Sequence, residues 1–279
     1  MTGVQTCALP ISTTGHVDAA AGYAQQIPVR VIGILLGVPE TMSDEFTSWV
    51  RDVLEFAHIP ERRIRGRDNI VRYFINEMEQ RRANPGDDLI SYLLSAEVDG
   101  QKVPDGHVLG TVALTLIAGV DTTWSAIGSA MWHLATHPDD RRRLVAEPAL
   151  MATAIEELLR AYSPVTMARI VADDIEFHGC PMHQGDRVLL NFPAANRDPA
   201  VFPEADQVLI DREINRHVAF GAGIHRCAGS NLARMELRVA VEEFLARIPE
   251  FELDPEGEVT WAGGQVRGPR TVPVQFPVA

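Results

Sequence analysis

The stretch that decides the fold is FGAGIHRCAG, which runs from Phe220 to Gly229 and precedes a predicted helix over 230–247. Two glycines come before Cys227, and a third follows it two positions later. A helix N-terminus lowers the pKa of a nearby thiol and favours the thiolate, which is the form that binds metal. Glycines let the backbone approach a large flat ligand closely. The loop is therefore typical of a thiolate metal ligand, although most isolated cysteines are small buried hydrophobic residues.

Other motifs built from glycine and cysteine fit this loop less well. A dinucleotide-binding fingerprint needs a third glycine where Arg226 stands, and a zinc site needs further cysteines at ligand spacing. A cysteine phosphatase loop would place its arginine one position closer than Arg234. A thiol hydrolase needs a base, and the sequence marks neither His217 nor His225 for that role.

A second signal lies in an apolar segment over 105–136 that predicts one long helix. The segment contains Ala118-Gly119-Val120-Asp121-Thr122-Thr123, so that an acid and a hydroxyl stand among apolar residues and need partners when buried. Glycine in a helix costs about 1 kcal/mol relative to alanine, so we expect a compensating role for Gly119. One role is to open the helix to a ligand or water. The alternative is a kinked core helix in which Thr122 bonds to the preceding turn.

A third signal is the pair of Glu157 and Arg160 in a predicted helix over 149–161. Residues three positions apart can pair on one face of a helix. Taken alone, such a pair is most often an exposed one, which contributes only a few tenths of a kcal/mol.

The rest of the chain predicts one mainly α domain with a minor β part. Further predicted helices span 23–36, 68–82 and 88–96, and Ser43 is expected to cap another. Short extended pieces follow over 170–188 and 251–278, with an irregular meander over 196–215 between them.

Composition excludes several classes of protein. Of 279 residues, 46% are hydrophobic and 23% charged, which rules out a disordered chain. The net charge of −13 argues against nucleic acid as the partner. The cysteines Cys7, Cys180 and Cys227 form no disulfide framework, which favours a reducing cytoplasm. The longest apolar run, over 112–120, is far shorter than the ~20 residues of a membrane span. The string VQTCALPIS looks like a translated sequencing adaptor, so we expect residues 1–12 to be non-native and 13–279 to form the domain.

Together and in this order, the three signals resemble the cytochrome P450 family of haem-thiolate monooxygenases, from about His16 to the C-terminus. The strings GDDLISYLL, HLATHP, EELLRAYSP and ANRDPAVFP add to the resemblance. It implies a soluble bacterial member with the cytochrome P450 fold. Such members have roughly 400 residues, so we expect this chain to be truncated and to lack the N-terminal helices and part of the first β-sheet.

The resemblance implies a haem b cofactor with Cys227 as the axial ligand of its iron. Arg169 and His225 match positions that bind the haem propionates, where a cation pairs with a carboxylate. The full set of implied cofactor-binding residues is Ala118, Gly119, Arg169, Phe220, Gly221, His225, Cys227 and Gly229.

The resemblance also implies roles for acidic and basic residues. Asp121 and Thr122 match the acid and alcohol that deliver protons during catalysis. Glu157, Arg160 and Arg212 match a buried structural network that braces the meander, which would replace the exposed pair considered above.

The implied reaction inserts one oxygen atom of O2 into a small apolar organic substrate in the cytoplasm, without a nucleic acid or membrane partner. Electrons would come from NAD(P)H through a ferredoxin reductase and a ferredoxin. Arg226 and Arg234 either dock the acidic electron carrier or are ordinary solvated surface arginines. A truncated, non-catalytic haem-binding remnant is the alternative. The expected pocket residues are Leu114, Ile117, Ala118, Val165, Thr166, Gln265 and Val266.

Overall fold

The computed structural model of the protein describes residues 11 and 13–278. The expectation that residues 1–12 are non-native therefore falls almost wholly outside the described residues, as does Cys7.

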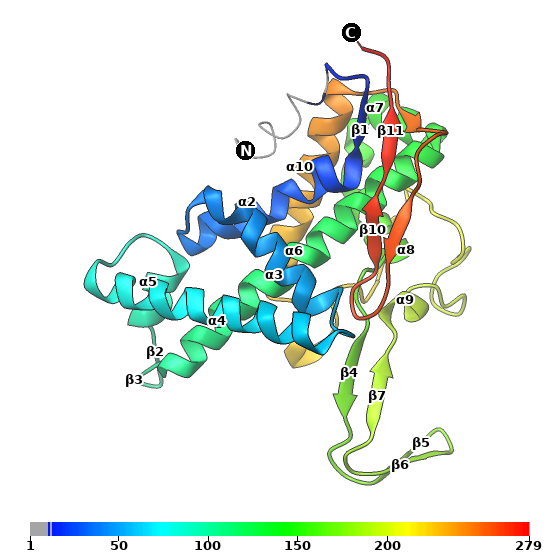
Figure 1. Ribbon diagram of the computed structural model, residues 1–279. Coiled ribbons are helices and arrows are strands. Elements are labelled where there is room, and N and C mark those ends of the chain that lie inside the picture. Colours follow the sequence, from blue (N-terminus) through cyan, green and yellow to red (C-terminus); the bar gives the residue numbers. More distant parts are fainter. Residues whose placement is uncertain (1–10, 12, 279) are drawn as a thin grey trace.

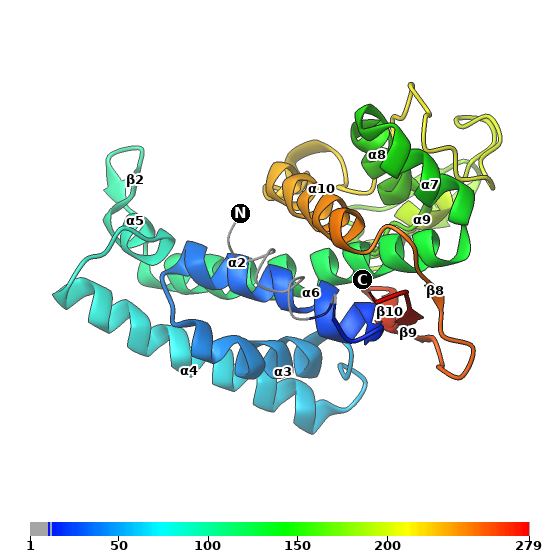
Figure 2. The same ribbon diagram turned by 90° about the horizontal axis from the view of Figure 1, so that it is seen from above.

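A long helix, α6 (Asp105–Thr136), runs through the middle of the protein, as Figure 1 shows. Elements from both halves of the chain pack along it, among them α2 (Gln26–Leu36), α3 (Ser43–Leu54), α10 (Ser230–Arg247) and β10 (Gly268–Thr271). In Figure 2 the helix α4 (Pro60–Ala83) lies beside α3 on the outer side of the molecule. The remaining helices are η1 (Ala19–Ala24), η2 (Glu40–Met42), α5 (Leu89–Ser95), α7 (Pro138–Ala146), η3 (Pro148–Leu150), α8 (Met151–Ala161), α9 (Phe192–Ala195) and η4 (Gly223–His225).

The strands form small antiparallel sheets at the edges of this helical body. In the three-stranded sheet, β11 (Pro273–Gln275) pairs with β1 (His16–Asp18) on one side and with β8 (Glu252–Leu253) on the other. The strand β10 pairs with β9 (Thr260–Ala262). Two further pairs project away from the helices in Figure 1: β4 (Met167–Ile170) with β7 (Arg187–Leu190), and β5 (Ile175–Phe177) with β6 (Cys180–Met182). The smallest pair is β2 (Glu97–Val98) with β3 (Gln101–Lys102).

The core consists of two apolar clusters that meet on α6. The first half of α6 supplies Val108, Val112 and Leu116 to the cluster with α2, α3 and α4. The second half supplies Trp124 and Ile127 to the cluster with α8 and α10. Burial on both sides explains why this helix carries so few charges.

These elements confirm a mainly α fold with a minor β part. The predicted bounds of α6 and α10 are confirmed, and the strands of 170–188 and the meander over 196–215 also lie where expected. The helix predicted over 68–82 starts earlier, at Pro60, because proline suits the first turn of a helix. The expectation that Ser43 caps a helix is wrong: Ser43 is the first residue of α3, and its hydroxyl donates to the carbonyl oxygen of Glu40.

Helix α6 is also the one described helix that is long and apolar enough to cross a membrane by length and composition. Because α6 contributes buried side chains to both apolar clusters, it serves as a core helix here. The compensating role expected for Gly119 proves to be close packing. A Cβ atom on Gly119 would lie 2.6 Å from Cδ1 of Ile32, so glycine lets α2 approach α6.

Candidate functional site

The cysteine loop has a backbone shape that depends on glycine. Gly221 and Gly223 adopt left-handed φ angles of 69° and 66°, which side chains with a Cβ atom rarely accept. The loop closes where the N–H of Cys227 donates to the carbonyl oxygen of Phe220 at 2.9 Å. The thiol of Cys227 is exposed and free, so the interpretation of a buried hydrophobic cysteine is wrong.

The donor set around this thiol fits haem. No group of three or more His, Cys, Asp or Glu side chains that could hold a metal ion occurs among the described residues. A single thiolate fits haem iron, which receives four further donors from the nitrogens of the porphyrin. The neighbouring Ile224 is 97% exposed, and a Cβ atom on Gly223 would meet nothing within 4 Å. An open loop with an apolar side chain is suited to a large flat ligand.

A charged group supports the loop from the side of α8. The guanidinium of Arg234 donates to both carboxylate oxygens of Glu156, at 2.6 and 2.9 Å, and lies 4.5 Å from the ring centre of Phe220. His217 contacts the same carboxylate at 3.0 Å. Burial would raise the pKa of Glu156, but its bonds to His217 and Arg234 outweigh burial and lower that pKa to about 2. Arg234 is thus engaged within the protein, whereas Arg226 is exposed.

Two candidate catalytic residues lie on α6. The hydroxyl of Thr122 donates to the carbonyl oxygen of Ala118 at 2.7 Å, which is the bond to the preceding turn that the sequence left open. Asp121 is only 1% exposed, and Arg270 Nη2 lies 2.8 Å from its Oδ1. This Nη2 contact is an ion pair without hydrogen-bond geometry, so neither carboxylate oxygen of Asp121 has a hydrogen bond within the described residues. Burial raises the pKa of Asp121 to about 6, although Arg270 opposes the rise.

The two residues expected to bind carboxylates keep their cationic groups free of protein acids. Arg169 lies on β4, and its guanidinium donates to the carbonyl oxygen of Ala168 at 2.9 Å. His225 is exposed at the end of η4. In the described part of the chain, neither side chain forms an ion pair, so both remain available for an external carboxylate.

The segments expected to line a pocket come together from distant parts of the chain. Val165 forms an isolated β-bridge with Val266, and the N–H of Thr166 donates to the carbonyl oxygen of Gln265 at 3.0 Å. On α6, Leu114 is 62% exposed. The sequence predicts that these residues line one pocket. The strand-like pairing brings residues 165–166 next to residues 265–266.

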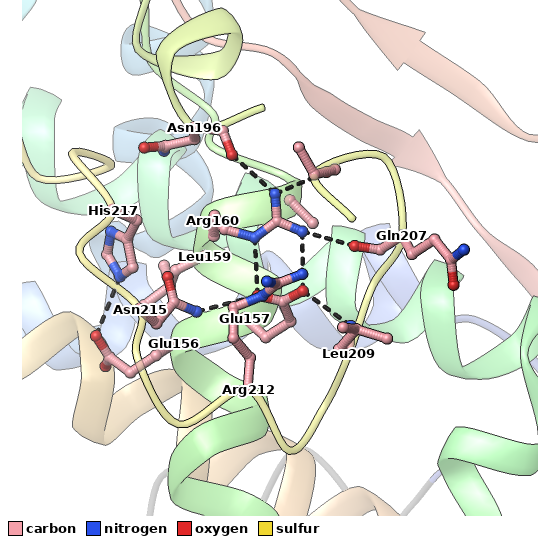
Figure 3. A network of polar contacts seen from close by, with 12 residues as sticks. Glu156, Glu157, Leu159, Arg160, Asn196, Gln207, Leu209, Arg212, Asn215 and His217 are labelled. Atoms are coloured by element: carbon pink, nitrogen blue, oxygen red, sulfur yellow. Dashed lines mark hydrogen bonds and ion pairs between the residues drawn. The ribbon is translucent and has the colours of Figure 1, made fainter. Parts of the chain in front are cut away.

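The acid Glu157 is the centre of a buried polar network (Figure 3). Its carboxylate is fully buried and accepts paired hydrogen bonds from Arg160, both at 2.8 Å. Arg212 and Asn215 of the meander donate to the same carboxylate at 2.9 and 3.0 Å, and the N–H of Leu209 donates at 2.8 Å. Burial opposes ionisation of Glu157, but these bonds outweigh it and lower the pKa.

The guanidinium of Arg160 extends this network to the backbone of the meander. It is also fully buried, and it donates to the carbonyl oxygens of Asn196, Ala205 and Gln207 at 2.7–2.8 Å. An exposed pair is therefore excluded. The structure brings Glu157, Arg160 and Arg212 into contact and ties the irregular segment to α8.

Sequence reasoning missed the residues that complete these groups. Arg270, which pairs with Asp121, lies in a C-terminal strand far along the chain from α6. Glu156 and Asn215 likewise reach their partners only through the fold. A lone acid in an apolar helix indicates that a cation lies near it, but no spacing in the sequence says which one.

Known proteins share this arrangement. The family model described as Cytochrome P450 matches residues 58–261. The mycinamicin IV hydroxylase/epoxidase of Micromonospora griseorubida is 36% identical over 95% of this chain and 68% of its own length. The steroid C26-monooxygenase of Mycolicibacterium smegmatis is 38% identical over 94% of this chain and 67% of its own length.

Solved structures give the same result. The structure of CYP109E1 from Bacillus megaterium in complex with testosterone has a TM-score of 0.90 at 31% identity, and covers 99% of this chain and 77% of that chain. The cytochrome P450 PksS of Bacillus subtilis has a TM-score of 0.91 at 31% identity, over 99% of this chain and 73% of that chain. The expectation that the chain represents only part of the family fold is thus confirmed. From the family model, the relatives and the solved folds together, the chain belongs to the cytochrome P450 family of bacterial monooxygenases and is an oxidoreductase.

Proposed function

We propose that residues 13–279 are the haem-thiolate part of a monooxygenase, with Cys227 as the axial ligand of haem b. The observation that carries this proposal is the free, exposed thiol on a glycine-shaped loop directly before α10. Bound haem supplies the activation of O2 and the insertion of one oxygen atom into an organic substrate. The chain supplies the ligand, the binding groups and the protons.

The groups that hold the haem follow from the charges and shapes at the site. The guanidinium of Arg169 pairs with one propionate and the imidazole of His225 donates a hydrogen bond to the other, because neither side chain is engaged by a protein acid. Ala118 is exposed on α6 and would face the macrocycle, while Gly119 beside it packs against Ile32 and lets α2 approach. The backbone of Phe220 accepts a hydrogen bond from the N–H of Cys227, and its ring lies 4.5 Å from the guanidinium of Arg234, which is held by Glu156. The aromatic ring thus keeps the loop in one position.

Two residues of α6, Thr122 and Asp121, would handle the protons. Thr122 holds its hydroxyl hydrogen toward the Ala118 carbonyl oxygen, which leaves the lone pairs of Oγ1 free to accept a hydrogen bond from a water. Asp121 changes its charge near neutral pH, because burial raises its pKa to about 6. A group with a pKa near the working pH both accepts and releases a proton readily.

The electrons come from NAD(P)H through a ferredoxin reductase and a ferredoxin. Family members use redox partners, and Arg226 offers this chain an exposed cation on the loop that carries the thiolate. Arg234 does not take part in docking, since its guanidinium is occupied by Glu156. We place the protein in the cytoplasm, in keeping with its bacterial relatives and its unpaired cysteines.

The substrate is a small apolar molecule. Leu114 is exposed on α6, and the paired segments at Val165 and Val266 add apolar side chains. The relatives carry the names mycinamicin IV hydroxylase/epoxidase, steroid C26-monooxygenase and vitamin D(3) 25-hydroxylase. We infer a substrate of that type, of polyketide or steroid size.

The decisive experiment is the absorption spectrum of the haem-reconstituted chain after reduction under carbon monoxide. A cysteine thiolate ligand gives the Soret band of the P450 type, and Cys227→Ser abolishes it. Cys180→Ser is the matched control, because Cys180 is also an exposed free cysteine but lies on β6. A histidine-type band in the wild-type chain, or a P450-type band that survives Cys227→Ser, would overturn the proposal.

The second candidate is a haem-binding remnant without catalytic activity. It is favoured by the span of the chain, which covers 68% and 67% of the two curated relatives. The two candidates separate once the P450-type band is observed. Product formation that depends on NAD(P)H, ferredoxin and ferredoxin reductase supports the monooxygenase, and haem binding with no product supports the remnant.

A further inference from the structure

A line of alternating charges joins Asp121 to the surface of α3. Arg270 Nη2 lies 2.8 Å from Asp121 Oδ1, and Arg270 Nε lies 3.1 Å from Glu55 Oε2. Glu55 in turn accepts two hydrogen bonds from Arg51, at 2.9 and 3.0 Å. Exposure of the side chains rises along this line, from 1% at Asp121 to 9%, 15% and 37% at the three residues that follow. The buried acid is thus connected to a solvent-facing arginine.

The position of Arg270 is fixed by the packing of β10 against α6. A Cβ atom on Gly268 would lie 2.3 Å from the Cβ atom of Ser125, so strand and helix touch at this point. The guanidinium lies 4.2 Å from the ring centre of Trp124, and its Nη1 donates to Ser125 Oγ at 3.2 Å. Asp121 lies on the same helix, one turn before Ser125. Contacts with Trp124, Ser125 and Glu55 therefore hold the guanidinium in place, in addition to its ion pair with Asp121.

We propose that Arg270 is a positioning residue that fixes the orientation and charge of Asp121, and that Glu55 anchors Arg270 so that helix α3 controls this acid. This inference rests on the proposed role of Asp121 in proton delivery. It adds a link between the acid and α3, because displacement of Glu55 removes the anchor of the cation that faces Asp121. Arg51 and Asp52 are the next charges on α3, and Arg62 and Arg65 of α4 bind Asp52.

The charge of Asp121 can be followed without haem through the pH dependence of folding. Burial raises the pKa of Asp121 to about 6 in the folded chain, against 3.8 as its ordinary value. The contribution of Asp121 to stability is thus complete below 3.8 and is lost as pH rises toward 6. The measured quantity is the free energy of unfolding of the chain minus that of the same chain with Asp121→Asn, between about pH 4 and about pH 8.

The test repeats this measurement in chains that carry Arg270→Gln, Arg270→Lys or Glu55→Gln. Loss of the cation in Arg270→Gln should raise the pKa of Asp121 in the folded chain, and with it the pH at which the curve levels off, by at least about one pH unit, a tenfold change in the ionisation constant. Arg270→Lys retains the positive charge, so its curve should lie close to that of the wild-type chain. Arg238→Gln is the control, because its exposed pair with Glu242 lies on the outside of α10.

The variant Glu55→Gln separates anchoring from simple repulsion. If Glu55 acted only through its negative charge, its removal would lower the pKa of Asp121. If Glu55 holds Arg270 in place, as we propose, this pKa rises. A pKa of Asp121 that is unchanged in Arg270→Gln, or that falls in Glu55→Gln, would overturn the inference. The proposed haem chemistry would be untouched by that result, because no haem is present in the measurement.

Discussion

Two buried acids on neighbouring helices, Glu157 of α8 and Asp121 of α6, have pKa values that are shifted in opposite directions. Their exposed fractions are 0% and 1%, so burial does not distinguish them. Glu157 accepts hydrogen bonds from Arg160, Arg212, Asn215 and a backbone N–H, and its pKa is lowered. Asp121 has one poorly aligned ion pair, and its pKa is raised to about 6. Burial disfavours ionisation of both acids, and only Glu157 has enough well-aligned partners to outweigh it.

This difference separates structure from chemistry. A fully satisfied carboxylate holds one charge at every working pH and ties the meander to α8. A carboxylate with few partners changes its protonation state easily, which is the property that proton delivery requires. The same residue type thus serves two purposes in adjacent parts of one core.

The largest effect is expected from breaking the satisfied network. Arg160→Ala leaves the buried Glu157 without its paired donor and frees three backbone carbonyl oxygens. Removing one partner of a buried ion pair costs about 3–5 kcal/mol, so we expect a loss of that size in the free energy of unfolding. Urea denaturation at neutral pH measures it. A loss below about 1 kcal/mol would show that the network is not the brace of the meander.

A third buried acid extends the comparison to the case of fewest partners. Glu236 on α10 is 5% exposed, and its Oε2 has no hydrogen bond within the described residues. Burial raises its pKa to about 8, so its contribution to stability is complete below 4.5 and is lost as pH rises to 8. Glu236→Gln should therefore stabilise the chain progressively, by about 1.4 kcal/mol per pH unit over this window. An equal effect at both ends of the window would contradict the raised pKa.

A smaller effect of the same sign is expected at Asp121. The charge of Asp121 becomes costly between 3.8 and about 6, so Asp121→Asn removes a pH-dependent loss of about 3 kcal/mol over that window. Above the window the difference between the two chains is constant. Thermal or chemical unfolding at several pH values measures the curve, and a flat difference throughout would remove the assignment of a titrating acid.

The smallest effect marks the exposed limit of the series. Arg238 and Glu242 form an exposed pair one turn apart on α10, at 2.7 Å. Such pairs contribute about 0.3–0.5 kcal/mol. Arg238→Ala should change the free energy of unfolding by no more than that, and a loss near that of Arg160→Ala would mean that distance alone, without burial, sets the energy of an ion pair.

Local patterns predicted much of this fold but not its long-range partners. The glycine loop and α10 are visible because turn glycines and a helix start are encoded by neighbours in sequence. The pair of Glu157 and Arg160 is visible for the same reason. Arg270 is not, because β10 meets α6 only after folding. The sequence leaves open whether Gly119 admits a ligand or water or belongs to a kinked core helix, and its observed role is to accommodate Ile32, which lies on another helix.

The contrast between the two acids is tested most directly by a pH titration of their side-chain carbons in chain labelled with ¹³C at aspartate and glutamate carboxyl groups. Asp121→Asn identifies the Asp121 signal by its loss. We predict that the Asp121 signal titrates with a midpoint near 6, while the Glu157 signal stays that of a carboxylate throughout the range above 4.5. An Asp121 signal that is unchanged between about pH 5 and about pH 8, or a Glu157 signal that titrates in step with it, would contradict the account.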